Sequence, residues 1–253
     1  MYPILFKAGI FEVHAYGFFI ALAFIIGIMI TLFYTRREGI DPQIVFDLAI
    51  YVLLSAIVGS RLFYVIGAWD QFKDNWPEMF MVQRGGLVFL GGFIFCLITV
   101  LIYCRLKKIP VFKLFDAIAP ATALGYSITR IGCFLNSCCF GLPTALPWGI
   151  KFPLGSLADS YFPGESLHPT QLYSMLSMLL VFVVLVLLYR KKSFDGQIFM
   201  WWFVFYAVYR FAVEAIRYCP IYWLGLTPAQ WMVIPLFIYG VWGLWYHRRK
   251  PGA

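Results

Sequence analysis

The chain has 253 residues, of which 62% are hydrophobic, 20% aromatic and 13% charged. Soluble domains contain about 45–50% apolar and about 25% charged residues, so this composition excludes a soluble enzyme, a disordered regulator and a disulfide-stapled secreted domain. The net charge of +8 would suit a nucleic-acid partner, but the sequence has no long basic tail, no aromatic RNA-binding signature and no zinc-finger spacing. We therefore expect an integral membrane protein that binds no nucleic acid.

The predicted elements are membrane-spanning helices, each of which needs about 20 mostly apolar residues. Seven stretches qualify, at residues 16–34, 44–69, 86–106, 113–136, 169–189, 197–217 and 228–246. The sequence thus predicts an all-α integral membrane protein with seven transmembrane helices, in a single domain over residues 1–253. Residues 70–85 and 137–168 are expected outside the spans, and the second segment is expected to lie on the membrane surface or to cover a cavity.

The basic residues alternate between the two sets of loops. The connections after the first, third, fifth and seventh stretches carry twelve Lys and Arg residues, whereas the opposite side carries five. Membrane proteins concentrate Lys and Arg in their cytoplasmic loops, so the count predicts an N-terminus outside and a C-terminus in the cytoplasm. Lys7 is the only cation before the first stretch and no small-residue cleavage site follows, so we expect no cleavable signal peptide.

Three arginines, Arg61, Arg130 and Arg210, lie within or at the edge of predicted spans. A charge deep in a bilayer costs at least about 2.5–3.5 kcal/mol, so such residues usually face a cavity or a partner. All three lie in the outer part of their predicted helices, at the depth of lipid headgroups, where guanidinium groups fit a phosphate. For Arg61 the alternative is that its side chain simply extends to the interface. Asp47 and Asp116, near the opposite ends, are expected to be helix-start or interface residues.

One predicted helix face gathers further polar groups around Arg210. Tyr206, Arg210 and Glu214 recur at intervals of four, and Arg217 follows after three more residues. These spacings place all four side chains on the same face of a helix. We expect Glu214 to pair with Arg210, which would orient the guanidinium and lower the cost of its desolvation.

Residues 129–141 are the most unusual part of the chain, because they place an arginine, an asparagine, three cysteines and two glycines at one membrane edge. Cys133, Cys138 and Cys139 form a candidate thiol site. On an oxidising outer side a disulfide from Cys133 to one of the other two is plausible, and plain buried thiols or a catalytic thiol are alternatives. A metal site lacks the usual paired Cys-x-x-Cys spacing, so we predict no metal.

Two more outer elements converge on this side in the predicted topology. A glycine cluster at residues 85–92 opens the third stretch, and the run from His168 to Tyr173, which contains Gln171, opens the fifth. His14 also lies at the outer face. Both histidines could line the site, and packing at a helix end is the alternative.

The run around Arg130 resembles the signature of the bacterial phosphatidylglycerol–prolipoprotein diacylglyceryl transferases, Gly-Arg-x-Gly-Asn-Phe-x-Asn-x-Glu-x-x-Gly. The chain matches it at Arg130, Gly132, Phe134, Asn136 and Gly141. Other runs are similar to further motifs of this family, in chain order: His14-Ala15-Tyr16-Gly17, Gly59-Ser60-Arg61-Leu62, His168-Pro169-Thr170-Gln171-Leu172-Tyr173, the Tyr206, Arg210 and Glu214 spacing, and Thr227-Pro228-Ala229-Gln230. The matches extend from the first stretch to the last.

The resemblance implies seven spans with the orientation counted above, in the bacterial inner membrane, with an active site that faces the outer leaflet. It implies transfer of a diacylglyceryl group from phosphatidylglycerol, or a similar anionic phospholipid, to the cysteine thiol of a prelipoprotein or a related acceptor, with release of glycerol phosphate and no cofactor. A thiolate would attack a glyceryl carbon while donors stabilise the leaving phosphate.

By the same resemblance Arg130, Arg210 and Tyr16 are expected to be catalytic. The residues expected to bind substrate are Asn136, Gly141, Tyr206, Glu214, Arg61, His14, His168 and Gln171.

The chain also departs from the family pattern. Leu90 stands where the family carries a histidine, and Thr129, Cys133 and Cys138 replace the signature's first Gly, its first Asn and its Glu. These changes favour a divergent member. Two alternatives follow: a relative that binds anionic phospholipid without this chemistry, and a thiol-redox membrane enzyme that uses the three cysteines.

Overall fold

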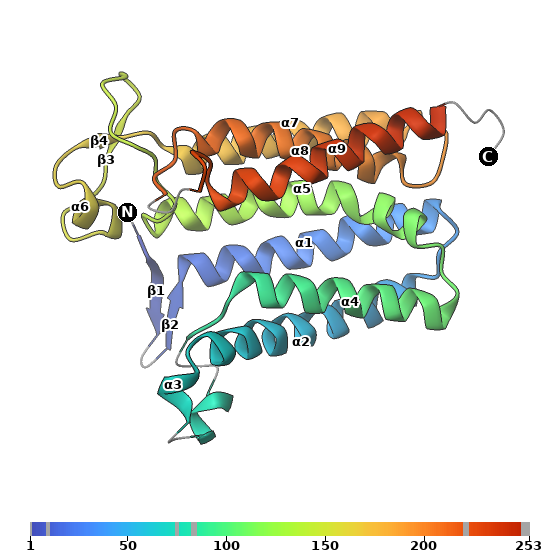
Figure 1. Ribbon diagram of the computed structural model, residues 1–253, viewed down its shortest axis with the longest axis horizontal. Helices are drawn as coiled ribbons and strands as arrows, with labels where there is room; N and C mark the ends of the chain where they lie inside the picture. Colours follow the sequence, from blue (N-terminus) through green and yellow to red (C-terminus); the bar gives the residue numbers. More distant parts are fainter. Residues whose placement is uncertain (1, 9–10, 74–75, 82–84, 220–222, 249–253) are drawn as a thin grey trace. The chain divides into compact units, whose positions relative to one another are not determined.

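A computed structural model describes residues 2–8, 11–73, 76–81, 85–219 and 223–248 (Figure 1). The chain divides into two compact units, one of residues 1–31 with 115–253 and the other of residues 32–114. The long helices α1 (Ala15–Arg37) and α5 (Val111–Leu135) each cross from one unit to the other along the chain. The single domain expected from the sequence stays a prediction.

The first unit is built from helices. Besides most of α1 and α5 it holds α7 (Thr170–Tyr189), α8 (Gln197–Glu214) and α9 (Pro228–Arg248). α8 packs against both α7 and α9, which lie beside it in Figure 1. Small residues allow a close approach: a Cβ added at Gly240 of α9 would lie 2.9 Å from the Met200 carbonyl oxygen of α8. Small residues at such contacts are typical of membrane helix pairs.

No capping side chain stands just before α8, and the carboxylate of Asp116 in α5 caps its N-terminus instead. Gly196 has a left-handed φ of 94° just before the first turn. The buried Asp116 carboxylate accepts hydrogen bonds from the backbone N–H groups of Gly196 at 2.7 Å and Phe199 at 2.9 Å, and pairs with Lys192 Nζ at 3.0 Å. A carboxylate stabilises the free N–H groups of a helix N-terminus. The predicted helix-start role of Asp116 is confirmed, although the helix it starts is not its own.

Short strands and a small helix add to the helices of this unit. β1 (Ile4–Ala8) pairs antiparallel with β2 (Phe11–His14), and β3 (Ile150–Lys151) pairs with β4 (Ser166–Leu167). The second pair lies in the predicted outer segment, together with α6 (Leu157–Tyr161). This segment has its own buried core of Phe140, Phe152, Ala158 and Leu167. It is therefore a folded element and not an extended loop.

The second unit contains α2 (Pro42–Gly67), α3 (Trp69–Phe72), the 3-10 helix η1 (Trp76–Phe80) and α4 (Phe89–Lys107). α2 and α4 pack closely through glycines, since a Cβ at Gly59 would lie 2.5 Å from the Gly91 carbonyl oxygen. Tyr103 of α4 donates to the Asp47 carboxylate of α2 at 2.6 Å. Asp47 is thus an interface residue within this unit, as expected.

Each predicted span overlaps one long helix of the described chain. By length and composition four of these helices, α1, α2, α4 and α7, can cross a membrane. The predominantly helical membrane character expected from the sequence is therefore present. The count of seven spans and the orientation of the termini stay predictions.

Candidate functional site

Arg130 lies in the last turns of α5 and is held by a tyrosine one turn earlier. Its Nη2 donates to the Tyr126 hydroxyl at 2.6 Å, and its Cζ lies 4.3 Å from the centre of the Tyr126 ring. Its Nη1 lies 3.8 Å from Cys133 Sγ. The Nε of Arg130 is buried and has no hydrogen-bond partner among the described residues. Tyr126 therefore fixes the orientation of the guanidinium group. The Nε is a buried donor without an acceptor, which is costly, so it would favour an acceptor brought by a ligand.

Arg210 and Glu214 form the ion pair that the spacing predicted. Arg210 Nη2 lies 2.8 Å from Glu214 Oε2, and Arg217 Nη1 lies 3.6 Å from the same oxygen. The Glu214 side chain is 3% exposed and that of Arg210 is 12% exposed. One carboxylate therefore serves two guanidinium groups, which leaves an excess of positive charge at this end of α8.

Tyrosines connect the two arginines. The Tyr126 ring packs edge-on against Tyr206 and Tyr209 of α8, and its hydroxyl lies 3.3 Å from that of Tyr209. Tyr206 interacts electrostatically with both Arg210 and Arg130. The structure thus brings Arg130, Arg210, Tyr206 and Glu214 into one neighbourhood, as the sequence suggested.

The sequence analysis did not select Tyr126 or Tyr209. A signal for Tyr126 was present, because Tyr126 precedes Arg130 by four residues just as Tyr206 precedes Arg210. This spacing places a tyrosine against each arginine on one helix face. Tyr209 carries no comparable signal, since only its packing against α5 brings it to the site.

The chain leaves α5 through a turn that presents the cysteines. Ser137 and Cys139 have φ of 53° and 61°, in the left-handed region that side chains other than glycine rarely adopt. Two buried side chains at the start of α7 hold this turn: Thr170 donates to the Cys139 carbonyl at 2.6 Å and Gln171 to the Cys138 carbonyl at 2.7 Å. Gln171 therefore positions the turn through its backbone.

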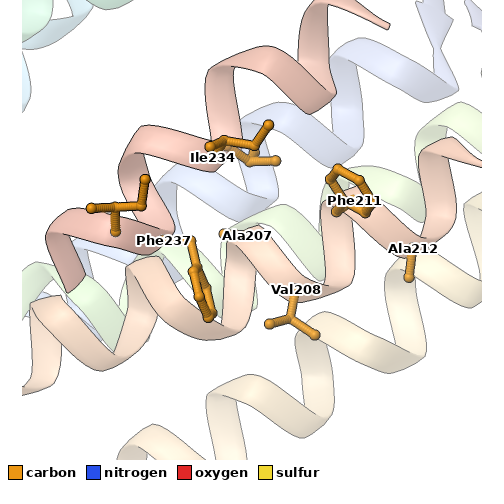
Figure 2. A pocket seen from close by; sticks show the side chains of 8 residues that line it. Ala207, Val208, Phe211, Ala212, Ile234 and Phe237 are labelled. Carbon is orange, nitrogen blue, oxygen red and sulfur yellow. The ribbon is translucent and has the colours of Figure 1, made fainter. Parts of the chain in front are cut away.

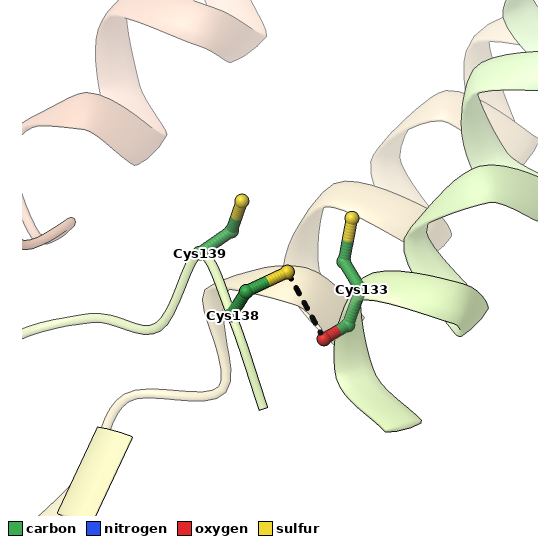
Figure 3. Close-up of side chains that lie close together, drawn as sticks. All are labelled: Cys133, Cys138 and Cys139. Carbon is green, nitrogen blue, oxygen red and sulfur yellow. Dashed lines mark hydrogen bonds between the residues drawn. The ribbon is translucent and has the colours of Figure 1, made fainter. Parts of the chain in front are cut away.

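The three thiols meet in space. Cys133, Cys138 and Cys139 are free, and their sulfur atoms all lie within 4.8 Å of one another (Figure 3). The pKa of the Cys139 thiol is lowered, first by hydrogen bonds from Cys133 and Cys138 and then by the positive charges of Arg217 and Arg130. The cluster therefore favours at least one thiolate.

Tyr16 joins the site through a close contact between α1 and α5. A Cβ added at Gly132 would lie 3.1 Å from Tyr16 Cα and 3.1 Å from Phe19 Cβ, so glycine allows the two helices to approach. Tyr16 lies within electrostatic reach of the three thiols and of Arg130, and it is 42% exposed. Tyr16 is thus a partly exposed side chain beside the thiols and Arg130.

At Gly141 the segment after α5 passes close to the segment before α7, at His168, and to the end of α8, at Ile216. Its N–H donates to the His168 carbonyl at 2.9 Å, and a Cβ there would lie 2.6 Å from His168 Cβ and 2.7 Å from the Ile216 carbonyl oxygen. The His168 ring lies with its Nδ1 3.3 Å from the Tyr173 hydroxyl, which also accepts from Trp148 Nε1 at 2.8 Å. Gly141 and His168 thus pack together next to the backbone of Arg217, at one side of the site.

Asn136 is exposed at the end of α5, where its side chain hydrogen-bonds Cys138. Two other expected site residues lie elsewhere. His14 is exposed at the end of β2, opposite Ile4. Arg61 belongs to the second unit. There it donates to the carbonyls of Glu78 at 2.6 Å, Gly85 at 2.7 Å and Met79 at 2.8 Å. Arg61 therefore fastens η1 and Gly85 to α2, and its expected contact with substrate stays a prediction.

An apolar cavity runs along α8 and α9 (Figure 2). Its volume is about 400 Å³. The side chains that line it are Ala207, Val208, Phe211, Ala212, Val233, Ile234, Phe237 and Ile238. The four α8 residues of this lining share one face of the helix, about 130° around its axis from Arg210, so the cavity and Arg210 lie on different faces of α8.

Comparison with known proteins agrees with the resemblance found in the sequence. Residues 3–246 match the model of the family described as prolipoprotein diacylglyceryl transferase. The chain is 35% identical over 227 residues to a phosphatidylglycerol–prolipoprotein diacylglyceryl transferase of Finegoldia magna, covering 89% of this chain and 88% of that protein. Proteins of the same name from Pediococcus pentosaceus and Synechococcus elongatus are 34% and 32% identical, each over 98% of this chain and over 90% and 88% of their own length.

Proposed function

Because this chain belongs to the prolipoprotein diacylglyceryl transferase family, we propose that it is a membrane transferase that moves a diacylglyceryl group from phosphatidylglycerol to the cysteine thiol of a prelipoprotein. Glycerol phosphate is the product released. The family and the names of the relatives support this reaction, whereas neither favours a binding-only protein or a thiol-redox enzyme.

The observation that carries the proposal is the unpaired positive charge around Arg130. Arg210 and Arg217 share the single Glu214 carboxylate, Arg130 interacts with Tyr206 as Arg210 does, and the Nε of Arg130 lacks an acceptor among the described residues. A phosphodiester carries one negative charge and the released phosphate monoester carries up to two. We assign Arg130 and Arg210 to the phosphate, where fixed guanidinium groups stabilise the charge that grows as the carbon–oxygen bond breaks.

The remaining roles follow from position. Tyr16 approaches the reacting atoms from α1, while Tyr206 and Glu214 orient Arg210. Gly141, His168 and Gln171 hold one side of the site. Asn136 and His14, both exposed, are assigned to the glycerol headgroup or the acceptor, and Arg61 to the headgroup region.

We further infer seven membrane spans with the N-terminus outside and the C-terminus in the cytoplasm, in the bacterial inner membrane. The excess of basic residues in the loops on the C-terminal side supports this orientation. The site then opens toward the outer leaflet, where a translocated prelipoprotein would meet phosphatidylglycerol.

The test is lipidation of a prelipoprotein in a bacterium depleted of its own transferase, with the mass of the lipoprotein as readout. We expect wild-type protein to restore the diacylglyceryl adduct, and Arg130→Ala and Arg210→Ala to abolish it. Arg190→Ala is the matched control, because Arg190 is an exposed arginine at the end of α7. Correct membrane insertion of each variant is verified by its detergent-extracted amount.

Two results would contradict the proposal, and a third would invalidate the comparison of variants. A wild-type protein that inserts and binds phosphatidylglycerol without any adduct would indicate a binding protein. Undiminished transfer by both arginine variants would remove the arginines from the reaction. Equal loss in Arg190→Ala would mean that the assay measures general damage.

A further inference from the structure

The three clustered cysteines have no role in the phosphate chemistry proposed above. Cys133 lies in the last turn of α5 and is 4% exposed, whereas Cys138 and Cys139 belong to the turn that follows this helix and are partly exposed. In Figure 3 their side chains extend into a common space from these two elements. Three free thiols held together in this way form the ligand set of a metal ion that prefers sulfur.

We propose that Cys133, Cys138 and Cys139 bind one Zn²⁺ through three thiolates and leave its fourth coordination position for the thiol of the acceptor prelipoprotein. This inference rests on the proposed transferase function and adds to it the group that activates the acceptor.

The distances fit a zinc ion. Zn–S bonds are about 2.3 Å long, so two sulfur ligands of a tetrahedral ion lie about 3.8 Å apart. The three sulfur atoms lie within 4.8 Å of one another. Binding therefore requires each pair to approach by at most about 1 Å, which rotation of the side chains provides.

The surrounding charges fit a thiolate-rich ion. A zinc ion with three protein thiolates carries one negative charge, and a fourth thiolate raises this to two. Arg130 lies with its Nη1 3.8 Å from Cys133 Sγ, and Arg217 and Arg130 both lie within electrostatic reach of Cys139. Two guanidinium groups thus balance the complete four-sulfur site.

The turn is fixed before any ion binds. Thr170 and Gln171 hold the carbonyls of Cys139 and Cys138 at 2.6 and 2.7 Å, and the N–H of Cys138 donates to the Cys133 carbonyl at 3.1 Å. Thr170 is 1% exposed and Gln171 is fully buried. A metal site of this kind needs ligands whose backbone is held by a second layer of hydrogen bonds.

The number of ligands points to catalysis. Structural zinc sites have four protein ligands, whereas catalytic sites have three and keep one position open. No fourth Cys, His, Asp or Glu donor joins the three thiols among the described residues. Because Cys138 and Cys139 are partly exposed, the open position is accessible from outside.

The reaction step then balances as follows. The acceptor thiol binds zinc and releases its proton to water, since a thiol that coordinates zinc is deprotonated. Its sulfur attacks the diacylglyceryl carbon that carries the phosphate oxygen, so a carbon–sulfur bond forms as the carbon–oxygen bond breaks. The bonding electron pair stays on the phosphate oxygen, beside Arg130 and Arg210, and the neutral thioether leaves the zinc.

The experiment starts from full-length protein purified in detergent with a mild reductant and no chelator. Elemental analysis is expected to give about one zinc ion per wild-type chain and less than about a tenth of that in Cys133→Ala and Cys138→Ala. Cys96→Ala is the matched control, because Cys96 lies in α4 outside the cluster. The protein is then loaded with Co²⁺, whose thiolate charge-transfer band reports the sulfur ligands.

The cobalt charge-transfer band also tests whether the fourth coordination position of the metal ion is open to the acceptor thiol. A lipobox peptide with its cysteine is expected to shift the cobalt band, whereas the same peptide with serine leaves it unchanged. Absence of zinc from wild-type protein, a disulfide within the cluster under these conditions, or an unchanged band with the cysteine peptide would each overturn the proposal.

Transfer assays separate this inference from the proposed function. Transfer at the full rate by zinc-free protein would overturn the zinc site and leave the transferase intact. A zinc-loaded protein that binds the cysteine peptide and makes no thioether would support the site and contradict the proposed function.

Discussion

Tyr126 supports Arg130 in two ways at once: its hydroxyl accepts from Nη2 at 2.6 Å and its ring lies 4.3 Å from the guanidinium carbon. The same tyrosine packs against Tyr206 and Tyr209 of α8. It therefore links the arginine of α5 to the helix that carries Arg210, and it fixes Arg130 without using the Nε that remains for a ligand.

We predict that Tyr126→Phe slows transfer about ten- to hundredfold, because the ring stays and a hydrogen bond to a charged group is worth about 1.5–3 kcal/mol. The loss should appear in kcat/KM for phosphatidylglycerol with an unchanged KM for the acceptor peptide. Tyr51→Phe is the control, since Tyr51 is 49% exposed on α2. An equal rise of KM for both substrates would show that Tyr126 only maintains the fold.

Glu214→Gln tests the carboxylate shared by Arg210 and Arg217. Removal of one partner from a buried ion pair costs about 3–5 kcal/mol, so thermal unfolding in detergent should move to a clearly lower temperature and transfer should fall with it. Arg217→Gln alone should cost less, because its side chain is 23% exposed and lies 3.6 Å from the carboxylate.

The double variant Glu214→Gln/Arg217→Gln refines this prediction. It removes one charge of each sign, so part of the lost stability should return while transfer stays low. If the double variant unfolds at the temperature expected from the sum of the two single changes, the charges do not interact as described.

The sequence predicted the helices well, because bilayer length and apolar composition act locally. The predicted span at 228–246 corresponds to α9 at Pro228–Arg248, and the span at 169–189 to α7 at Thr170–Tyr189. The ion pair of Arg210 and Glu214 was equally predictable, because helical spacing alone places both on one face.

Features that depend on contacts between distant segments could not be predicted. The Gln171 side chain holds the Cys138 carbonyl, 33 residues away, and no local pattern predicts this contact. The Asp116 carboxylate starts α8 from a position 80 residues before Gly196. The strands β3 and β4 have two residues each, which is too short to give an alternating pattern.

Gly141→Ala tests the close approach of three segments. The new methyl group would lie 2.6 Å from His168 Cβ and 2.7 Å from the Ile216 carbonyl oxygen, and the latter is backbone that cannot move aside easily. We expect a loss of about 1–3 kcal/mol in stability and loss of transfer. The measurement is thermal unfolding together with the lipidation assay.

Gly27→Ala is the matched control for this change. Gly27 lies in α1 with nothing within 4 Å of an added Cβ, so alanine should leave stability unchanged or raise it by up to about 1 kcal/mol. Equal destabilisation by both variants would mean that the approach at Gly141 is not tight.

Two acidic residues that share Lys192 allow a test of the start of α8. Asp116 is fully buried, holds Lys192 at 3.0 Å and accepts from the N–H groups of Gly196 and Phe199, whereas the Asp195 side chain is 45% exposed and lies 3.3 Å from Lys192. Asp116→Ala leaves the N–H groups of Gly196 and Phe199 without their acceptor and removes one of the two carboxylates beside Lys192, so it should lower stability by about 3–5 kcal/mol. Asp195→Ala removes an exposed ion pair worth about 0–1 kcal/mol and serves as the control.

The activity of these two variants separates stability from chemistry. Arg210 lies fourteen residues after Gly196 on α8, which is about 21 Å along a helix, so the change at Asp116 does not reach the arginines. The folded fraction of Asp116→Ala should therefore transfer lipid at the wild-type rate at low temperature and lose activity at a lower temperature than Asp195→Ala does. A reduced rate per folded molecule in the cold would contradict this, because it would couple the start of α8 to the reaction itself.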